Sequence, residues 1–361
     1  MRKFLLVLLM LPLPVSAQRL EDSDGRKAVS LSNDKIDLTV LLNGGTLARL
    51  VLSGDPERIS PLATMGHFLC LDGFGAPSSE EMAAGMPFHG EASKQLWKVT
   101  SSPSSGKLRS LRISALLPLA QENISRTLEI VDGENVIYVE SELENLVAVD
   151  RPVSWAEHAT IGPPFLEKGK LVVDMPGARC RVRAEKPHAL PNRLVFLRDF
   201  TWPMAPAVDG GQADLRSVPE QNYLDLASCQ MDPKRTLGFV TALHLGKHLL
   251  FGYVFRREEY PWVMSWMNYT GNARAARGME FSTQPFDVSR RETVEANPMF
   301  GTPTFRWLPA KSKIRSRFLL FYARAPEGLT KVDDITLAGG VLTIEDCAAG
   351  KRITLPVSLP L

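Results

Sequence analysis

The feature that most constrains this chain is a two-residue alternation of apolar and polar side chains. The alternation is clearest in residues 35–42, 107–117 and 124–145. Side chains on a β-strand point to opposite faces in turn, so this period predicts strands with one buried face. Within 124–145, two such runs flank the turn sequence DGEN, which predicts a β-hairpin. Only the short segments 79–85 and 328–337 have a pattern that allows a helix.

The strand pattern continues toward the C-terminus without a sequence repeat, a low-complexity tract or a long linker. The 26 glycines and 26 prolines are spread along the chain and favour many turns. So many strands predict an all-β fold, most economically a large antiparallel β-sandwich of two sheets packed face to face. We expect a single domain over residues 18–361. The alternative is a small sandwich up to about residue 150 and a second one after it.

The N-terminal segment predicts export. Arg2 and Lys3 precede an apolar run from about residue 4 to residue 15, and the small residues Ser16 and Ala17 follow. This pattern is typical of a secretory signal peptide over residues 1–17. The run is too short to span a bilayer, so we expect no membrane insertion and a periplasmic or extracellular protein.

The charge of the chain excludes partners that need a strong electrostatic field. Removal of the two basic residues in the signal peptide reduces the 42 basic residues to 40, which equals the 40 acidic ones. A net charge near zero gives no field that would attract nucleic acid. Neutral partners such as sugars fit this composition better.

The cysteines leave their pairing open. Their spacing contains no C-x-x-C motif, so we expect no structural metal site. An exported chain can oxidise one pair, but the sequence does not say which. The four candidates are Cys70, Cys180, Cys229 and Cys347.

Three segments place an ionisable group on a strand or at its end. His89 lies in PFHGEA, His158 lies in WAEHATIGPPFLE, and Glu280 lies in RGMEFSTQPF. On a strand, Glu280 and Ser282 share one face, and burying a carboxylate there costs several kcal/mol unless it is paired. Such a carboxylate is either a working group or a structural ion pair, for which Arg277 is the nearest candidate.

Two histidines and one carboxylate meet the chemical needs of sugar-ring opening. A carboxylate takes the proton of the anomeric hydroxyl, and an imidazolium gives a proton to the ring oxygen. Histidine suits proton transfer because its ordinary pKa is about 6.5. Hydrolysis by a serine nucleophile is not indicated, since the chain has no G-x-S-x-G motif.

Five segments, in this order, resemble the aldose 1-epimerase (galactose mutarotase-like) superfamily, and more closely its bacterial branches. They are PLATMGHFLCLDGFG, GMPFHGEASKQLW, TLEIVDGENVIYVESELENL, WAEHATIGPPFL and GMEFSTQPF. The resemblance implies a large β-sandwich, called a supersandwich, with a sugar lying in a cleft across one sheet. It also implies interconversion of sugar anomers without a cofactor or a metal.

The resemblance gives roles to the three ionisable residues. His89 matches the first active-site histidine of the family and would orient the sugar. His158 resembles the second, which protonates the ring oxygen. Glu280 matches the family's base if the pattern is Gly-x-Glu, whereas the longer pattern Gly-x-x-x-Glu-x-Gln puts Ser282 at that position.

Further residues are candidates for substrate binding. The family's Asn-Arg pair ahead of the first histidine is absent, and Arg126 or Arg277 is the candidate replacement for that arginine. Trp266 is the preferred stacking platform for a sugar face. His67 and Ser282 complete the predicted binding set.

Three functions follow from these observations. The first is an exported aldose 1-epimerase-like isomerase. The second is a non-catalytic carbohydrate-binding protein of the same fold, which Ser282 at the base position favours. The third is a β-sandwich scaffold for protein contacts. The identity of the sugar and the oligomeric state stay open, because specificity lies in loops that short motifs do not determine.

Overall fold

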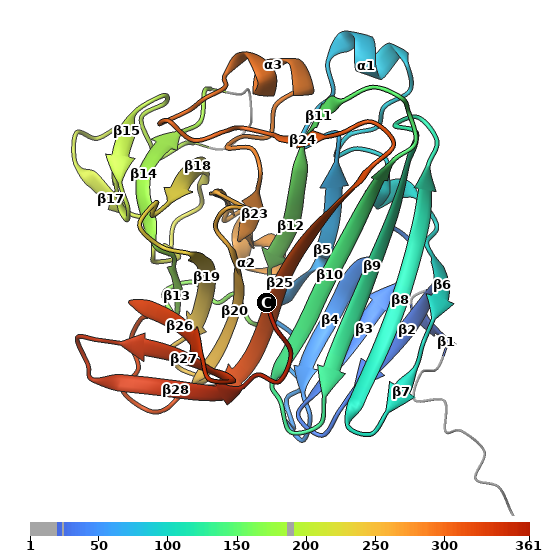
Figure 1. The fold of residues 1–361 in the computed structure, drawn as a ribbon. Coiled ribbons are helices and arrows are strands. Elements are labelled where there is room, and N and C mark those ends of the chain that lie inside the picture. The colour runs from blue at the N-terminus through green and yellow to red at the C-terminus, as the bar shows by residue number, and fades with distance from the viewer. Residues whose placement is uncertain (1–19, 24, 186–190) are drawn as a thin grey trace, which may run out of the picture.

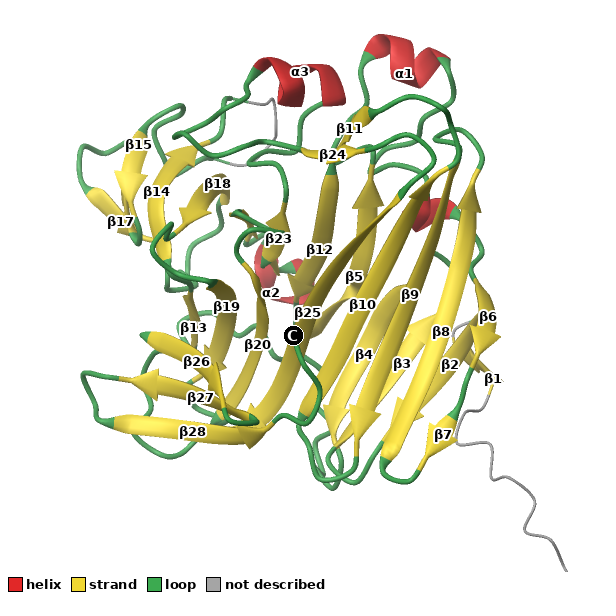
Figure 2. Cartoon of the chain, viewed as in Figure 1, coloured by secondary structure: helices red, strands yellow, loops and turns green. Residues whose placement is uncertain are grey.

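The computed structural model describes residues 20–23, 25–185 and 191–361 (Figure 1). The signal peptide predicted over residues 1–17 lies outside the described residues. Strands dominate the part of the chain that is described, and every strand-to-strand ladder within it is antiparallel (Figure 2). The predicted all-β class is therefore confirmed.

The first large sheet, called sheet one, has 14 strands within the described residues. It runs in the order β1-β2-β3-β4-β5-β12-β22-β21-β18-β14-β15-β16-β17, and β23 pairs with both β12 and β21. The bounds of its strands are β1 Leu20–Ser23, β2 Arg26–Ser32, β3 Ile36–Leu41, β4 Thr46–Leu52, β5 Leu62–Leu71, β12 Trp155–Ile161, β14 Gly177–Val182, β15 Asp199–Thr201, β16 Met204–Pro206, β17 Gln212–Asp214, β18 Leu224–Met231, β21 Trp262–Asn268, β22 Ala276–Gly278 and β23 Glu280–Ser282.

The second large sheet, called sheet two, has nine strands in the same described ranges. Its order is β13-β19-β20-β25-β10-β9-β8-β6, and β7 pairs with β8. The bounds are β6 Lys98–Ser101, β7 Ser104–Ser105, β8 Leu108–Leu117, β9 Glu122–Val131, β10 Val136–Asn145, β13 Leu171–Asp174, β19 Leu237–His244, β20 Leu249–Arg256 and β25 Lys313–Arg324. Both sheets contain strands from either side of residue 150, so a division there would cut both of them.

The two large sheets pack face to face and enclose the main core. In Figure 1 the strands β8, β9 and β10 lie in front of β2, β3 and β4. The alternation of the sequence determines which side chains enter this core. In β9, for example, Ile124, Leu128 and Ile130 are fully buried, whereas the alternate positions 123, 125, 127, 129 and 131 are half-buried. Burial of apolar surface between the sheets is the main stabilising contribution to such a sandwich.

A third sheet covers part of the outer face of sheet two. It consists of β26 Asp334–Ala338, β27 Val341–Asp346 and β28 Lys351–Pro356, at the red end of the chain in Figure 1. Its apolar side chains form a second core with the outward side chains of β19, β20 and β25. Sheet two is therefore buried on both faces along these strands.

Short helices and one small strand pair lie at the ends of the sandwich. They are α1 Ser79–Ala83, the 3₁₀ helix η1 Ala92–Lys94, α2 Gly271–Arg274, α3 Arg290–Glu295, and the pair β11 Arg151–Val153 with β24 Arg306–Leu308. Both α1 and α3 begin with a capping box, in which a serine side chain and a glutamate three residues later satisfy backbone N–H groups. Among the described residues, no helix has the length and apolar character needed to cross a membrane.

Candidate active site

The floor of the candidate site is one row of side chains across the outer face of sheet one. Phe68 on β5 pairs with His158 on β12. The antiparallel register of β12 with β23 places His158 opposite Glu280. Glu280 in turn pairs with Met264 on β21. Four strands, from three separate parts of the chain, thus bring these four side chains next to one another.

His158 and Glu280 lie close together at the centre of this row. Nε2 of His158 is 3.6 Å from Oε1 of Glu280, which is longer than a hydrogen bond. On its other side, Nδ1 of His158 is 3.1 Å from the hydroxyl of Thr160. Phe68 stacks on the His158 ring with a centroid distance of 4.3 Å. The imidazole is therefore held from two sides with Nε2 directed toward the carboxyl group.

Glu280 is buried, and neither of its carboxyl oxygens has a hydrogen-bond partner among the described residues. Burial raises the pKa of Glu280 well above its usual value, the charge of Asp287 raises it further, and Arg183 opposes the shift. Burial likewise lowers the pKa of His158 well below its usual value, and the nearby His89 adds to this. The environment therefore favours the neutral form of both groups.

A glycine makes room for the Glu280 carboxyl group. Gly278 lies two residues before Glu280, on the same face of the sheet, and is buried. A Cβ atom at position 278 would overlap Oε1 of Glu280 and would lie 3.0 Å from the backbone nitrogen of Trp266. The absence of a side chain at 278 thus allows the carboxyl group to lie against the backbone.

His89 reaches the same place from a loop rather than from a strand. Its backbone has a positive φ of 67°, and its N–H donates to the carbonyl of Gly75 over 3.0 Å. The N–H of Gly75 donates in return to Nδ1 of His89 over 3.1 Å. Burial lowers the pKa of His89 to about 4, with a smaller contribution from Lys94. A neutral ring that accepts at Nδ1 carries its proton on Nε2, which can donate to a ligand.

The two imidazoles and the carboxyl group line one cavity of about 410 Å³. The centroids of the His89 and His158 rings are 4.8 Å apart. Trp266, the predicted stacking platform, lines the same cavity and is half-buried. The volume lies within the range of ligand-binding pockets, roughly 300–1,000 Å³. The structure therefore brings together the three predicted catalytic residues and one predicted binding residue.

Sequence reasoning missed several residues of this cavity, above all Arg183 and Asp287. Their side chains form an ion pair, with Nη2 of Arg183 2.9 Å from Oδ2 of Asp287. A signal for Arg183 was present, because Cys180 and Val182 point into the core and the alternation places position 183 on the outer face. Asp287 directly follows the segment that resembles the family, and no pattern indicated its role.

Two predicted substrate-binding residues lie elsewhere, and the prediction for them was wrong. Arg126 and His67 are completely buried between the two sheets. Nη2 of Arg126 donates to both oxygens of Glu157, at 2.7 and 2.8 Å. His67 contacts Glu157 through Nε2 at 2.8 Å and the hydroxyl of Tyr253 through Nδ1 at 3.1 Å. These residues form an internal polar network that joins the sheets and does not reach the pocket.

This network also explains why Glu157 does not orient the adjacent His158. The two residues are neighbours on β12, so their side chains point to opposite faces of sheet one. Glu157 accepts further hydrogen bonds from Trp155 Nε1 and from the hydroxyl of Tyr260, both at 3.2 Å. The Arg126 and His67 contacts hold the pKa of Glu157 at about 2, against the opposing effect of burial. Glu157 is a structural anion of the core.

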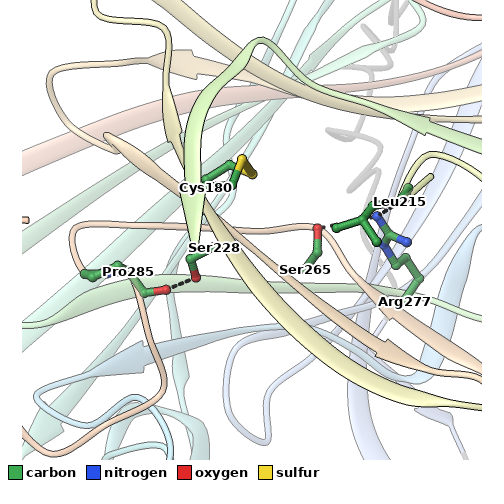
Figure 3. The surroundings of a disulfide bond; sticks show 7 residues. Cys180, Leu215, Ser228, Ser265, Arg277 and Pro285 are labelled. Carbon is green, nitrogen blue, oxygen red and sulfur yellow. Dashed lines mark hydrogen bonds between the residues drawn. A yellow bond between two sulfur atoms is a disulfide. The ribbon is translucent and has the colours of Figure 1, made fainter. Parts of the chain in front are cut away.

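Arg277 and Ser282 do not line the cavity either, and their prediction as binding residues was also wrong. Arg277 is fully buried and donates to the hydroxyl of Tyr269. It also donates to the carbonyl of Leu215 and to the hydroxyl of Ser265 (Figure 3). Arg277 has these internal partners instead of Glu280, so the structural ion pair considered from the sequence is not formed. The Ser282 hydroxyl donates to the carbonyl of Gln284.

One disulfide bond lies beside this part of sheet one. Cys180 on β14 and Cys229 on β18 occupy paired positions of neighbouring strands and are bonded (Figure 3). Cys70 and Cys347 are free. The sequence left this pairing open, because strand neighbours 49 residues apart cannot be identified from spacing. Among the described residues, no three or more His, Cys, Asp or Glu side chains gather as a metal site would need.

Comparisons with known proteins place the fold but not the reaction. No protein-family model and no curated protein matches this sequence. Solved structures do match it. A candidate aldose 1-epimerase from Klebsiella pneumoniae superposes with a TM-score of 0.60 at 13% identity, over 85% of this chain and 83% of that one. A galactose mutarotase-like protein from Clostridium acetobutylicum gives 0.58 at 13% identity, over 85% and 98%.

The same fold also occurs as part of a larger protein. A TPR-domain containing protein from Parabacteroides distasonis superposes with a TM-score of 0.56 at 10% identity, over 86% of this chain and 50% of that one. Identities this low establish a common fold and nothing finer. The chain has the galactose mutarotase-like β-sandwich fold, as the resemblance of its sequence segments implied.

Proposed function

We propose that this protein is an exported, carbohydrate-active isomerase of the aldose 1-epimerase type, which interconverts the anomers of a sugar by acid–base ring opening. One observation carries the proposal: a buried carboxyl group without a hydrogen-bond partner in the described protein lies 3.6 Å from an imidazole in an accessible pocket. A buried polar group without a partner is costly, and such groups gather at working sites.

In the proposed reaction, Glu280 takes the proton of the anomeric hydroxyl while His158 gives its proton to the ring oxygen. The bond between the anomeric carbon and the ring oxygen breaks, and the anomeric C–O becomes a carbonyl. Rotation about the neighbouring carbon–carbon bond presents the other carbonyl face, and the same two proton transfers in reverse close the ring. Nε2 of His89 donates a hydrogen bond that orients the sugar.

The two proton transfers of this reaction require that Glu280 and His158 together hold one proton before the sugar reacts. Burial favours the pair in which both groups are neutral, with the proton on Glu280. Moving that proton to His158 gives the carboxylate and imidazolium that open the ring, without uptake or loss of a proton by the protein. Each positioned acid or base contributes roughly 10²–10⁴-fold to rate, which is substantial for a reaction that also proceeds spontaneously.

The location outside the cytoplasm has support from two sides. The N-terminal sequence has the pattern of a secretory signal. The disulfide bond between Cys180 and Cys229 is of a kind that persists in oxidising compartments.

Polarimetry on several aldoses tests the proposal. We expect the protein to accelerate the approach of each accepted anomer to equilibrium, and His158→Ala to remove at least 99% of that acceleration. His248→Asn is a matched control, because His248 is exposed on the hairpin between β19 and β20 and asparagine tolerates its positive φ of 51°. Equal rates for wild type and His158→Ala would refute the catalytic role.

A second candidate function is sugar binding without catalysis, and two observations favour it. The environment favours the neutral forms of Glu280 and His158, in which neither has the charge that ring opening requires. Ser282 also occupies the position that the longer family pattern assigns to the base, and its hydroxyl bonds a carbonyl instead. Calorimetric binding of an aldose with no acceleration of its mutarotation would establish this alternative.

A further inference from the structure

The wall of the pocket is more apolar than the hydroxyl groups of a free aldose require. Four aromatic side chains line it, namely Phe68, Phe74, Phe88 and Trp266. Phe88 and Met65 are 53% and 42% exposed, so the mouth is apolar as well as the floor.

Three polar side chains of the pocket gather at one end. Glu280, His158 and His89 are within reach of one another. The other two charged side chains that line the pocket, Arg183 and Asp287, are paired with each other. A sugar whose anomeric centre lies at Glu280 and His158 would find polar partners at that end.

The remaining floor continues away from this end as an apolar strip. Met264 follows Glu280 in the transverse row, and the register of β18 with β21 places Leu226 beside Trp266. Leu226 and Trp266 also line an adjoining hollow of about 50 Å³, in which Phe196 and Leu224 lie beside the charged side chains of Arg183 and Asp225. The strip therefore leads from the Glu280–His158 pair toward a second, smaller hollow, and its apolar side chains end at Leu226, beside Arg183.

We infer that the sugar taken by this pocket carries an apolar substituent, aryl or alkyl, at a position distant from its anomeric carbon. The inference rests on the proposed function. The reducing end lies at Glu280, His158 and His89, and the substituent lies on the strip formed by Met264, Trp266 and Leu226. A hydroxyl-bearing ring on that strip would lose its hydrogen bonds to water without replacement, whereas an apolar group gains from burial.

Three reducing sugars that share one anomeric centre test this inference. They are D-glucose, 6-O-benzyl-D-glucose and isomaltose, which carries a second, polar ring on the same oxygen. For each we measure Kd by calorimetry and anomer exchange by NMR. We expect a Kd for the benzyl ether at least tenfold below those of glucose and isomaltose, a ratio that corresponds to about 1.4 kcal/mol.

Variants of the strip link the preference to this surface. Leu226→Asn should reduce the preference for the benzyl ether to below threefold, and Phe196→Ala, at a half-buried site, should reduce it in the same direction. Val208→Ser is the control, since Val208 is 59% exposed on the hairpin between β16 and β17 and lies outside both hollows. Retention of the full preference in both strip variants would overturn the inference.

The outcomes separate the two proposals. Accelerated anomer exchange of glucose, with equal affinity for the benzyl ether, overturns the apolar-substituent inference and leaves the isomerase. Tighter binding of isomaltose than of the benzyl ether overturns it in favour of an oligosaccharide. Tight binding of the benzyl ether without accelerated exchange supports the inference and refutes catalysis. Absence of binding for all three sugars refutes both.

Discussion

Replacing Glu280 with glutamine should make the protein more stable and less active, and the gain in stability should depend on pH. The side chain of Glu280 is buried without a hydrogen-bond partner among the described residues, and burial raises its pKa. Folding therefore increases the affinity of this carboxyl group for its proton. Glutamine has nearly the same shape but no proton to lose, so the substitution isolates the contribution of ionisation.

The sign and size of the effect follow from proton linkage. Below pH 4.5, the ordinary value for glutamate, Glu280 is protonated in both states and does not make stability pH-dependent. Between that pH and the raised pKa, unfolding releases a proton, so the free energy of unfolding of the wild type falls by about 1.4 kcal/mol per pH unit. Above the raised pKa the loss is complete. The stability advantage of Glu280→Gln should rise over the same window.

Urea unfolding of both proteins from pH 4 to pH 9 measures this difference. Polarimetry on the same samples should show a loss of roughly 10²–10⁴-fold in the acceleration of mutarotation, since the variant lacks the base. Glu129→Gln is the control for the amide substitution itself, because Glu129 is half-buried on the outer face of sheet two and remote from the pocket. A stability difference that stays constant across the whole pH range would refute the reasoning, since Glu280 would then titrate as it does in the unfolded chain.

Three more predictions concern the shared proton, the space beside the carboxyl group and the internal network. The rate of anomer interconversion should stay level as the pH passes through 6.5 and 4.5. The reason is that Glu280 and His158 together hold one proton from the lowered pKa of His158 up to the raised pKa of Glu280. A midpoint at 6.5 in a pH–rate profile would contradict this. Gly278→Ala should reduce the rate of anomer interconversion at least tenfold, because the added methyl group displaces the Glu280 carboxyl group. It should also lower the free energy of unfolding, measured with urea, by about 1–3 kcal/mol. Unchanged activity would show that the position of the carboxyl group is not critical. Arg126→Met should cost about 3–5 kcal/mol of unfolding free energy at pH 7, because it leaves the Glu157 carboxylate buried without its main partner; a loss below 1 kcal/mol would show that the network contributes little.

Two further variants serve as matched controls for these substitutions. Gly246→Ala adds a methyl group where a Cβ atom would meet nothing closer than 3.7 Å, so it should leave stability and activity unchanged. Arg256→Met removes an exposed arginine that bonds the C-terminal residue Leu361, and it should cost less than about 1 kcal/mol.

The strands and the unusual position of Glu280 could be predicted because both are properties of single segments, whereas its association with His158 was predicted from the family resemblance. Alternation over a few residues determines that a strand has two different faces, and a carboxylate beside Met279 and Phe281 signals an unusual burial. The structure places Met279 and Phe281 in the main core and Glu280 on the opposite face. The identity of the residues that flank Glu280 in space was not predictable in this way, because the register between strands depends on contacts across the whole chain.

The two wrong assignments of Arg126 and His67 have a specific origin, and the sequence held a signal against them. In β9, Arg126 alternates in step with Ile124 and Leu128, which are core residues. In β5, His67 alternates in step with Leu69, another core residue. A polar residue in phase with the apolar face of a strand belongs to the core side, where it needs an internal partner. Both residues find that partner in Glu157.

The position of Glu157 also clarifies why neighbouring carboxylates on the two faces of sheet one have opposite properties. Glu157 on the inner face is as buried as Glu280 on the outer face, yet its pKa is lowered to about 2, because Arg126 and His67 offset the cost of burial. Glu280 has no such partner and retains its proton more tightly. Burial alone therefore does not distinguish a structural carboxylate from a working one; the presence or absence of a fixed cation does. By this criterion only Glu280, of the two, keeps a proton that it can pass to His158 in the proposed reaction and so become the base.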